Sequence, residues 1–159
     1  DLLTPDKAVV EEHRGTVKGF LSGRKKGARA VHLKERLLRA MDEYVAPFRS
    51  AKGLEEGLST VRGIGEEIGH VLVADSGANN LELSEAIETK LGVDAAELTI
   101  GSALFRRESR GHHNRTDFPE TDDRNWRCHS VVRAEGGKPV YKKRDVVYTR
   151  LRPPDGYAR

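Results

Sequence analysis

The chain has 159 residues, of which 33% are charged and 36% hydrophobic, and it contains one cysteine. That length suits a single domain, and the lone cysteine excludes an internal disulfide framework and a multi-cysteine zinc or iron–sulfur site, which favours a reducing compartment. We expect a soluble chain, because no run approaches the ~18 apolar residues that span a bilayer and no secretory signal pattern is present. The chain begins at Asp1 and its single methionine is Met41, so we expect it to be part of a longer protein.

Charge is distributed unevenly along the chain. Residues 1–50 carry 11 basic and 7 acidic side chains, residues 51–100 carry 3 and 10, and residues 101–159 carry 14 and 8. An acidic middle between basic ends argues against one continuous nucleic-acid-binding stripe. It favours a chain that folds back so that opposite charges meet.

A first helix is predicted from Thr4-Pro5-Asp6, which supplies a capping hydroxyl, a proline at the first helical position and an acid in the first turn. Apolar residues then recur at steps of three and four up to Leu21, and the basic run at 23–27 ends the helix as a solvated loop. A second, stronger helical pattern runs from Ala28 to Phe48, where Pro47 ends or kinks it.

A third helix is predicted across residues 54–72. Four glycines weaken it, at about 1 kcal/mol each in a helix interior, so it must be held by packing. These are Gly57, Gly63, Gly65 and Gly69. After a loop at 74–80, in which Asn79 or Asn80 can cap the next element, a fourth helix carries apolar and then small residues up to Phe105. The residues alone allow either one long helix or a break at 92–94.

The helical period stops after Gly111. Short strands are predicted at 131–132, 140–141 and 145–148, with a hairpin turn at Glu135-Gly136-Gly137-Lys138, and Pro153-Pro154 closes the ordered part. We therefore expect a mainly α protein: a helical bundle over residues 1–111, with an extended loop and short-strand tail over 112–159 packed on the same domain.

Ionisable residues are concentrated between residues 103 and 129, and three chemistries are conceivable for them. A hydrolase would need Ser109 or Cys128 as nucleophile beside a histidine, yet no Gly-x-Ser-x-Gly elbow surrounds Ser109. The candidate bases are His112, His113 and His129, with Asp117 as the orienting acid. A metal site would use His113, Asp117 and His129, whose spacing matches no known metal motif.

Nucleic-acid binding would use the basic residues of the same segment, with Trp126 and Tyr141 as stacking partners. The basic residues are Arg106, Arg107, Arg110, Arg115, Arg124, Arg127, Lys142, Lys143 and Arg144. Interleaved acids cancel their attraction to phosphate. A structural interpretation places Arg106, Arg107 and Arg110 in the last turns of a helix that ends at Gly111, and assigns the dense polar groups to a surface that sets its register on another protein surface.

The stretch "SALFRRESRGHHNRTDFPETDDRNWRCHSVV" resembles the C-terminal segment of the flavoprotein subunits of succinate dehydrogenase and fumarate reductase, in which a run of the form R-x-E-S-R-G-x-H-x-R-x-D-[FY]-P is followed by D-D-x-N-W and a histidine. The stretches "LKERLLRAMDEYVAPFRSAKGLEEGLSTV" and "NNLELSEAIETKLGVDAAELTIGSAL" also look like helices of this family. The resemblance covers roughly residues 30 to 150.

The resemblance implies a three- to four-helix, spectrin-like bundle with a short β-hairpin-containing C-terminal tail, and it favours one long fourth helix. It implies the C-terminal domain of an FAD-dependent oxidoreductase, without catalytic, cofactor-binding or metal-binding residues of its own. FAD and the dicarboxylate would be bound by the preceding domains. The implied interface with the flavin domain comprises Glu108, Arg110, His113, Arg115 and Asp117.

The implied partners are the chain's own FAD-binding domain and an iron–sulfur subunit, without nucleic acid or direct membrane insertion. The implied location is the cytoplasm, or the inner face of a membrane through partner subunits. Two alternatives stay open: the C-terminal domain of an adenylylsulfate reductase-type flavoprotein, and a free-standing basic helical module that binds nucleic acid.

Overall fold

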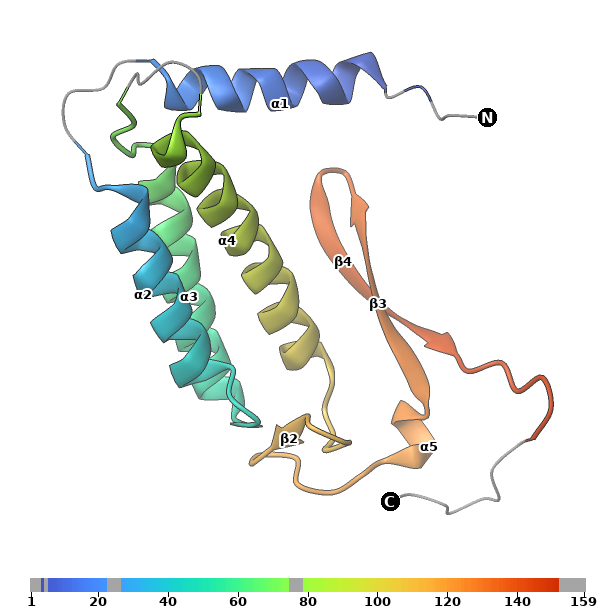
Figure 1. Cartoon of the computed structure of the whole chain (residues 1–159). Helices are drawn as coiled ribbons and strands as arrows, with labels where there is room; N and C mark the ends of the chain where they lie inside the picture. The colour runs from blue at the N-terminus through green and yellow to red at the C-terminus, as the bar shows by residue number, and fades with distance from the viewer. Residues whose placement is uncertain (1–3, 5, 23–26, 75–78, 152–159) are drawn as a thin grey trace. The chain divides into compact units, whose positions relative to one another are not determined.

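The computed structural model describes residue 4 and residues 6–22, 27–74 and 79–151 (Figure 1). It is mainly helical and ends in an antiparallel hairpin, as the sequence predicts. The elements are α1 (Lys7–Phe20), α2 (Ala30–Tyr44), β1 (Phe48–Arg49), α3 (Ala51–Ile68), α4 (Leu81–Phe105), β2 (Asn114–Arg115), α5 (Asp123–Trp126), β3 (Cys128–Glu135) and β4 (Lys138–Asp145). The predicted features at Pro5, at 23–26, at 75–78 and at Pro153-Pro154 lie outside the described residues.

The chain forms two compact units. The first unit comprises Asp1–Arg39 and Val61–Asp94, and the second comprises Ala40–Thr60 and Ala95–Arg159. Each of the helices α2, α3 and α4 therefore contributes one part to each unit. The predicted division into residues 1–111 and 112–159 stays a prediction.

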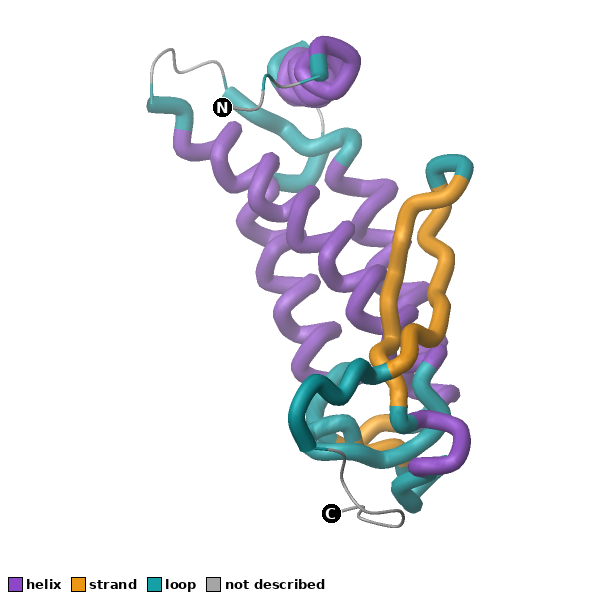
Figure 2. Tube along the Cα trace, turned by 90° about the vertical axis from the view of Figure 1, so that its right-hand side faces the viewer, coloured by secondary structure: helices purple, strands orange, loops and turns teal. Residues whose placement is uncertain are grey.

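The first unit has an apolar core supplied by α2, α3 and α4, whose segments in this unit lie side by side (Figures 1 and 2). Ile64 and Ile68 of α3 are 0% exposed, and full burial of such a side chain contributes about 1.5–3 kcal/mol. This burial offsets the cost of the glycines in α3. The other buried apolar side chains of these three helical segments are Ala30, Leu33, Leu37, Val61, Ala86 and Val93.

Side-chain oxygens cap two helices of this unit. The carboxylate of Asp6 accepts a hydrogen bond from the backbone N–H of Ala8 at 2.8 Å, so Asp6 is the N-cap of α1. The prediction of a Thr4 cap was wrong, because the carboxylate two residues later accepts from the N–H of Ala8 in the first turn. At α4 the amide oxygen of Asn80 accepts from the N–H of Leu83 at 3.0 Å, which is one of the two predicted caps.

The second unit contains both small sheets. Strands β1 and β2 are parallel, with Phe48 opposite Asn114 and Arg49 opposite Arg115. Strands β3 and β4 form one antiparallel hairpin, and its turn lies at Gly136 and Gly137, whose φ values of 59° and 74° favour glycine. The short strands predicted at 131–132 and 140–141 are parts of this hairpin, and the segment predicted as a strand at 145–148 contributes only its first residue to β4.

α5 and the hairpin pack on α4 through aromatic rings and one glycine. Phe105, the last residue of α4, lies 5.5 Å from Trp126 and 6.1 Å from Tyr141 between ring centroids. The hydroxyl of Tyr141 approaches Gly101 so closely that a methyl group there would overlap it. The small residue in the fourth helix therefore lets the hairpin approach.

Candidate functional site

The residues predicted to form the site follow α4 in a folded loop. The helix ends at Phe105, so the prediction that Arg106, Arg107 and Arg110 occupy its last turns was wrong. Gly111 has a φ of +57°, but it serves a tight turn in which the N–H groups of Arg110 and His113 donate to each other's carbonyls at 2.8 and 3.0 Å. We call residues 106–118 the site loop.

Glu108 is the centre of the site loop and is 0% exposed. Its carboxylate accepts hydrogen bonds from Nε of Arg106 at 2.9 Å, from Nε and Nη2 of Arg110 at 2.8 and 3.0 Å, and from the N–H of Asp122 at 2.9 Å. Burial alone would raise the pKa of Glu108, but the hydrogen bonds from Arg110, Asp122 and Arg106 lower it below its ordinary value. The carboxylate is thus held ionised and is not a proton donor near neutral pH.

The two arginines on Glu108 extend the network toward α5 and β3. Nη2 of Arg110 lies 2.5 Å from Oδ1 of Asp123, whose Oδ2 accepts from Arg127 at 2.7 Å. Nη1 of Arg106 donates to the carbonyl of Cys128 at 3.2 Å, and Nη2 donates to the carbonyl of Trp126 at 2.7 Å. The network therefore fixes the site loop to the segment that starts the hairpin.

Arg115 joins two helix ends. It is 2% exposed, and its Nε and Nη2 donate to the two carboxylate oxygens of Asp117 at 2.8 and 2.7 Å. Its Nη1 donates to the carbonyls of Ala103 and Arg106 at 2.8 and 3.1 Å, where a cation also opposes the negative end of α4. Asp117 in turn accepts from the N–H of Ala51, the first residue of α3, at 3.0 Å. The hydrogen bonds from Arg115, and then from Ala51, lower the pKa of Asp117 to about 2.

The hydroxyl of Ser109 is committed to the loop itself. It accepts from the N–H of Arg115 at 2.8 Å and donates to the carbonyl of Phe118 at 2.9 Å. Within the described residues, no histidine hydrogen-bonds to Ser109 or Cys128. The hydrolase hypothesis therefore lacks the nucleophile–base contact that it requires.

Two residues of the predicted metal site, Asp117 and His113, have hydrogen-bond partners within the chain. Asp117 is paired with Arg115, and Nε2 of His113 lies 3.3 Å from the carbonyl of Arg106. Burial lowers the pKa of His113, as do the charges of Arg49, Arg115 and Arg106, against the opposing effect of that carbonyl. Across the described ranges, no group of three or more histidine, cysteine, aspartate or glutamate side chains is arranged to hold a metal ion.

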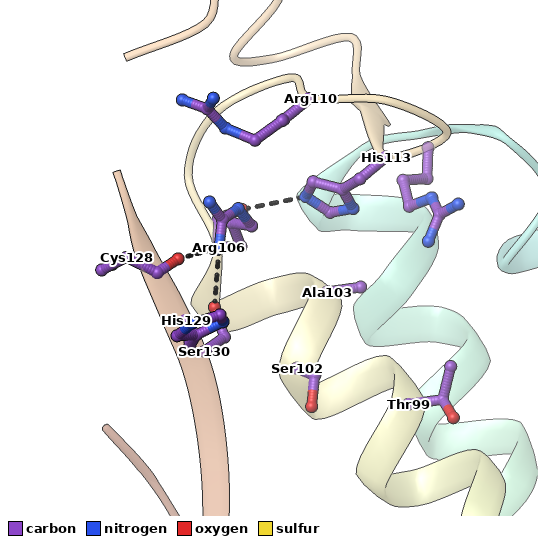
Figure 3. A pocket seen from close by; sticks show the side chains of 10 residues that line it. Thr99, Ser102, Ala103, Arg106, Arg110, His113, Cys128, His129 and Ser130 are labelled. Carbon is purple, nitrogen blue, oxygen red and sulfur yellow. Dashed lines mark hydrogen bonds between the residues drawn. The ribbon is translucent and has the colours of Figure 1, made fainter. Parts of the chain in front are cut away.

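A groove of about 530 Å³ lies beside the network. Figure 3 shows His113 directed toward Arg106, with Cys128, His129 and Ser130 along the hairpin side. The residues that line the groove are Arg49, Thr99, Ser102, Ala103, Arg106, Arg110, His113, Cys128, His129 and Ser130. Nothing in the sequence singles out Arg49, because no spacing signal connects β1 to a loop more than 50 residues later; only the β1–β2 pairing brings them together.

The cations of the predicted nucleic-acid surface are largely neutralised within the chain. Arg106 and Arg110 pair with Glu108, Arg115 pairs with Asp117, and Arg127 pairs with Asp123. Guanidinium groups that already bind carboxylates attract phosphate weakly. The arrangement is that of a fixed loop bordering a polar groove.

Residues 34–156 match the protein family described as "Fumarate reductase flavoprotein C-term". The chain is 35% identical over 115 residues to a subunit of the CoM/CoB fumarate reductase of Methanothermobacter marburgensis, covering 72% of this chain and 21% of that protein. It is 34% identical over 127 residues to the fumarate reductase flavoprotein subunit of Helicobacter pylori, covering 76% and 18%. It is 33% identical over 121 residues to the succinate dehydrogenase flavoprotein subunit of Rickettsia bellii, covering 75% and 20%. The chain spans about a fifth of the length of these curated relatives.

Solved structures show the same fold. The Mycobacterium smegmatis Sdh1 complex matches with a TM-score of 0.74 at 27% identity, covering 92% of this chain and 25% of that one. Adenylylsulfate reductase of Archaeoglobus fulgidus matches with a TM-score of 0.73 at 26% identity, covering 91% and 25%. E. coli quinol fumarate reductase matches with a TM-score of 0.79, covering 96% and 27%, and at 24% identity this likeness concerns the fold alone.

Proposed function

The chain belongs to the family of C-terminal domains of fumarate reductase and succinate dehydrogenase flavoproteins, and from this premise we propose that it supports and docks on the flavin domain of an FAD-dependent oxidoreductase of that type, without catalytic residues of its own. The parent enzyme would move a hydride between a dicarboxylate and FAD and exchange electrons with an iron–sulfur subunit. It would reside in the cytoplasm or on the inner face of a membrane through partner subunits. No helix among the described residues is long and apolar enough to cross a bilayer.

One observation supports this proposal: the motif residues of the site loop hydrogen-bond mainly to one another and so fix the conformation of the loop. Glu108 and Arg115 are buried, so we assign them to positioning the loop. Arg110 and His113 are half-buried and Asp117 is exposed, and we assign these three residues to contact with the flavin domain. A motif of this kind presents a rigid polar surface, which is what a docking interface needs.

The described residues do not fit an FAD-binding site of their own. Gly63 and Gly65 lie inside α3, and the described strands form two sheets of two strands each. Neither sheet leads through a glycine-rich turn into a helix, which is the arrangement that cradles a dinucleotide pyrophosphate. FAD is therefore assigned to the remainder of the flavoprotein.

The test uses the isolated chain and the full-length flavoprotein side by side. We expect the isolated chain to fold, as seen by circular dichroism, to be colourless and to lack succinate-dependent electron transfer. A yellow preparation with stoichiometric FAD would contradict the proposal. In the full-length protein, Arg110→Gln and Asp117→Asn should reduce flavin retention or assembly before they alter the chemistry, whereas Arg107→Gln, at an exposed site outside the groove, should not.

The adenylylsulfate reductase branch is a second candidate, favoured by the likeness to the Archaeoglobus fulgidus enzyme. Assays of the full-length protein with succinate, fumarate and adenylylsulfate separate the two branches. For a free-standing nucleic-acid module, the isolated chain would have to bind DNA or RNA with a steep salt dependence. We expect no such binding at low salt, since the arginines of the network are already paired.

A further inference from the structure

Arg49 differs from the other buried or half-buried arginines around the site loop, which are Arg106, Arg110 and Arg115. Its Nε is buried and, among the side-chain atoms of the described residues, is the one buried polar atom without a hydrogen-bond partner. The only hydrogen bond that its guanidinium makes to a described residue runs from Nη2 to the carbonyl of His112, at 3.3 Å. A guanidinium presents a planar fork of N–H donors that suits a carboxylate. Arg49 therefore has donor capacity that the described residues do not satisfy.

The charges around Arg49 leave it uncompensated. Within the described part of the chain, no carboxylate lies within ion-pair distance of Arg49, whereas Arg106, Arg110 and Arg115 each have one. Burial lowers the pKa of Arg49, and the nearby charge of Arg115 lowers it further. A partly buried cation without a counter-charge is destabilising, and an incoming anion would relieve that cost.

The groove gives such an anion a place to enter. Arg49 lines it together with Arg106 and Arg110. Glu108 is shared between Arg106 and Arg110, and Asp123 also pairs with Arg110, so the described carboxylates of this cluster lie on those two arginines and leave the charge of Arg49 unmatched. The neutral form of His113 is favoured by its lowered pKa, so His113 adds little positive charge to the groove.

We propose that the groove binds a carboxylate side chain of the flavin domain, with Arg49 as its principal donor. The inference rests on the proposed docking function and names the chemistry of the group that docks. A carboxylate fits better than a phosphate because it is a planar monoanion that a guanidinium fork grips with two hydrogen bonds. Glu108 and Asp123 already pair with Arg110, and their negative charges would repel a dianion more than a monoanion.

The first experiment tests the chemistry on the chain itself. Propionate, which mimics a glutamate side chain, is titrated into the 15N-labelled chain at constant ionic strength while the Arg49 Nε–H resonance is followed. We expect a saturable shift that propionamide does not produce. Arg49→Leu should weaken the propionate affinity by about tenfold or more. The absence of a saturable shift would overturn the proposal.

The second experiment identifies the source of the carboxylate in the full-length flavoprotein. Arg49→Lys keeps a cation and supplies an amine that a carbodiimide joins to a contacting carboxylate as an amide. Mass spectrometry should map this link from position 49 to an acidic residue of the flavin domain. A link only to acids of the present chain, or no link, would overturn the inference. Arg107→Lys is the control, because Arg107 is exposed and does not line the groove.

The two proposals fail in different ways. If the docking function is wrong, removing this chain leaves FAD retention and assembly of the rest of the flavoprotein unchanged. If only the inference about Arg49 is wrong, the protein is loaded with FAD and position 49 gives no cross-link to the flavin domain. Arg49→Lys retains the charge at the site, so we expect the variant to fold. Circular dichroism before cross-linking checks this.

Discussion

Ion pairs lie on the surface of the first unit, whereas in the second unit they reach the interior. Arg36 and Glu67 of the first unit form a two-bond pair whose side chains are 50% and 44% exposed. In the second unit the side chains of Glu108 and Arg115 are 0% and 1% exposed. Exposed pairs typically contribute about 0–1 kcal/mol, whereas removing one partner of a buried pair costs about 3–5 kcal/mol.

The apolar core of the first unit and the buried ion pairs of the second unit have different roles. The first unit buries Ile64, Ile68 and Val61 at 0% exposure, and this apolar packing supplies stability without directional bonds. Buried ion pairs are a weak source of stability, because desolvation cancels much of their attraction. Their directional hydrogen bonds instead define one arrangement of the site loop, which is what a docking surface requires.

The largest expected effect comes from breaking the buried network at its centre. Glu108→Gln keeps the shape of the side chain but removes the charge that Arg106 and Arg110 share. We expect a loss of about 3–5 kcal/mol in the free energy of unfolding, measured by urea denaturation. Glu66→Gln, at an exposed carboxylate of α3, is the control and should change little. A loss for Glu108→Gln that matches the control would mean that the network is not structural.

Ile64→Ala tests the contribution of the apolar core of the first unit to stability. Ile64 is fully buried in the first unit, so truncation removes transfer free energy and leaves a cavity. We expect a loss of about 3 kcal/mol. The same denaturation experiment measures it, with the resonances of the site loop as a second readout. Those resonances should not move in Ile64→Ala, and they should move in Glu108→Gln; movement in both would remove the distinction between the units.

The sequence predicts the helices and the hairpin better than it predicts the site loop. Apolar periodicity predicts the helices, the family resemblance favours an unbroken α4, and two adjacent glycines predict the hairpin turn. The site loop was located by its motif, yet its geometry was not predictable. Asp117 binds the N–H of Ala51 across 66 positions of sequence, and Arg49 meets the loop only through β1 and β2. Local patterns carry no information on such pairings, because tertiary packing decides them.

A smaller effect is expected where the hairpin meets α4 in the second unit. Gly101→Ala would place a methyl group against the hydroxyl of Tyr141, and overpacking of this kind costs about 1–3 kcal/mol. Tyr141→Leu removes the overlapping atoms. The double variant should therefore be more stable than the sum of the two single changes predicts, as a double-mutant cycle of unfolding free energies would measure. Additive losses would mean that the two side chains do not meet.

Acid should weaken the second unit through Asp117. Its pKa is lowered from 3.8 to about 2 by Arg115 and the N–H of Ala51, so the folded state binds a proton less readily than the unfolded state. The stabilisation is complete above about pH 4 and is lost as the pH falls toward 2. Discounted for solvent exposure, it amounts to about 1 kcal/mol. Denaturation at a series of pH values should show this slope, and Asp117→Asn should flatten it; an unchanged slope would contradict the assignment.

The smallest effect is expected at the exposed pair of Arg36 and Glu67 in the first unit. This pair tests whether burial or hydrogen-bond geometry determines the strength of an ion pair. Arg36 donates two hydrogen bonds of 2.7 and 2.9 Å to Glu67, a geometry as good as that of the two bonds from Arg110 to Glu108. Geometry alone would therefore predict similar losses for Glu67→Gln and Glu108→Gln. Because water solvates both Arg36 and Glu67, we expect a coupling of only about 0–1 kcal/mol in a double-mutant cycle, and salt should screen it further. A coupling of several kcal/mol at this exposed pair would show that bidentate geometry, rather than burial, sets the strength of ion pairs in both units.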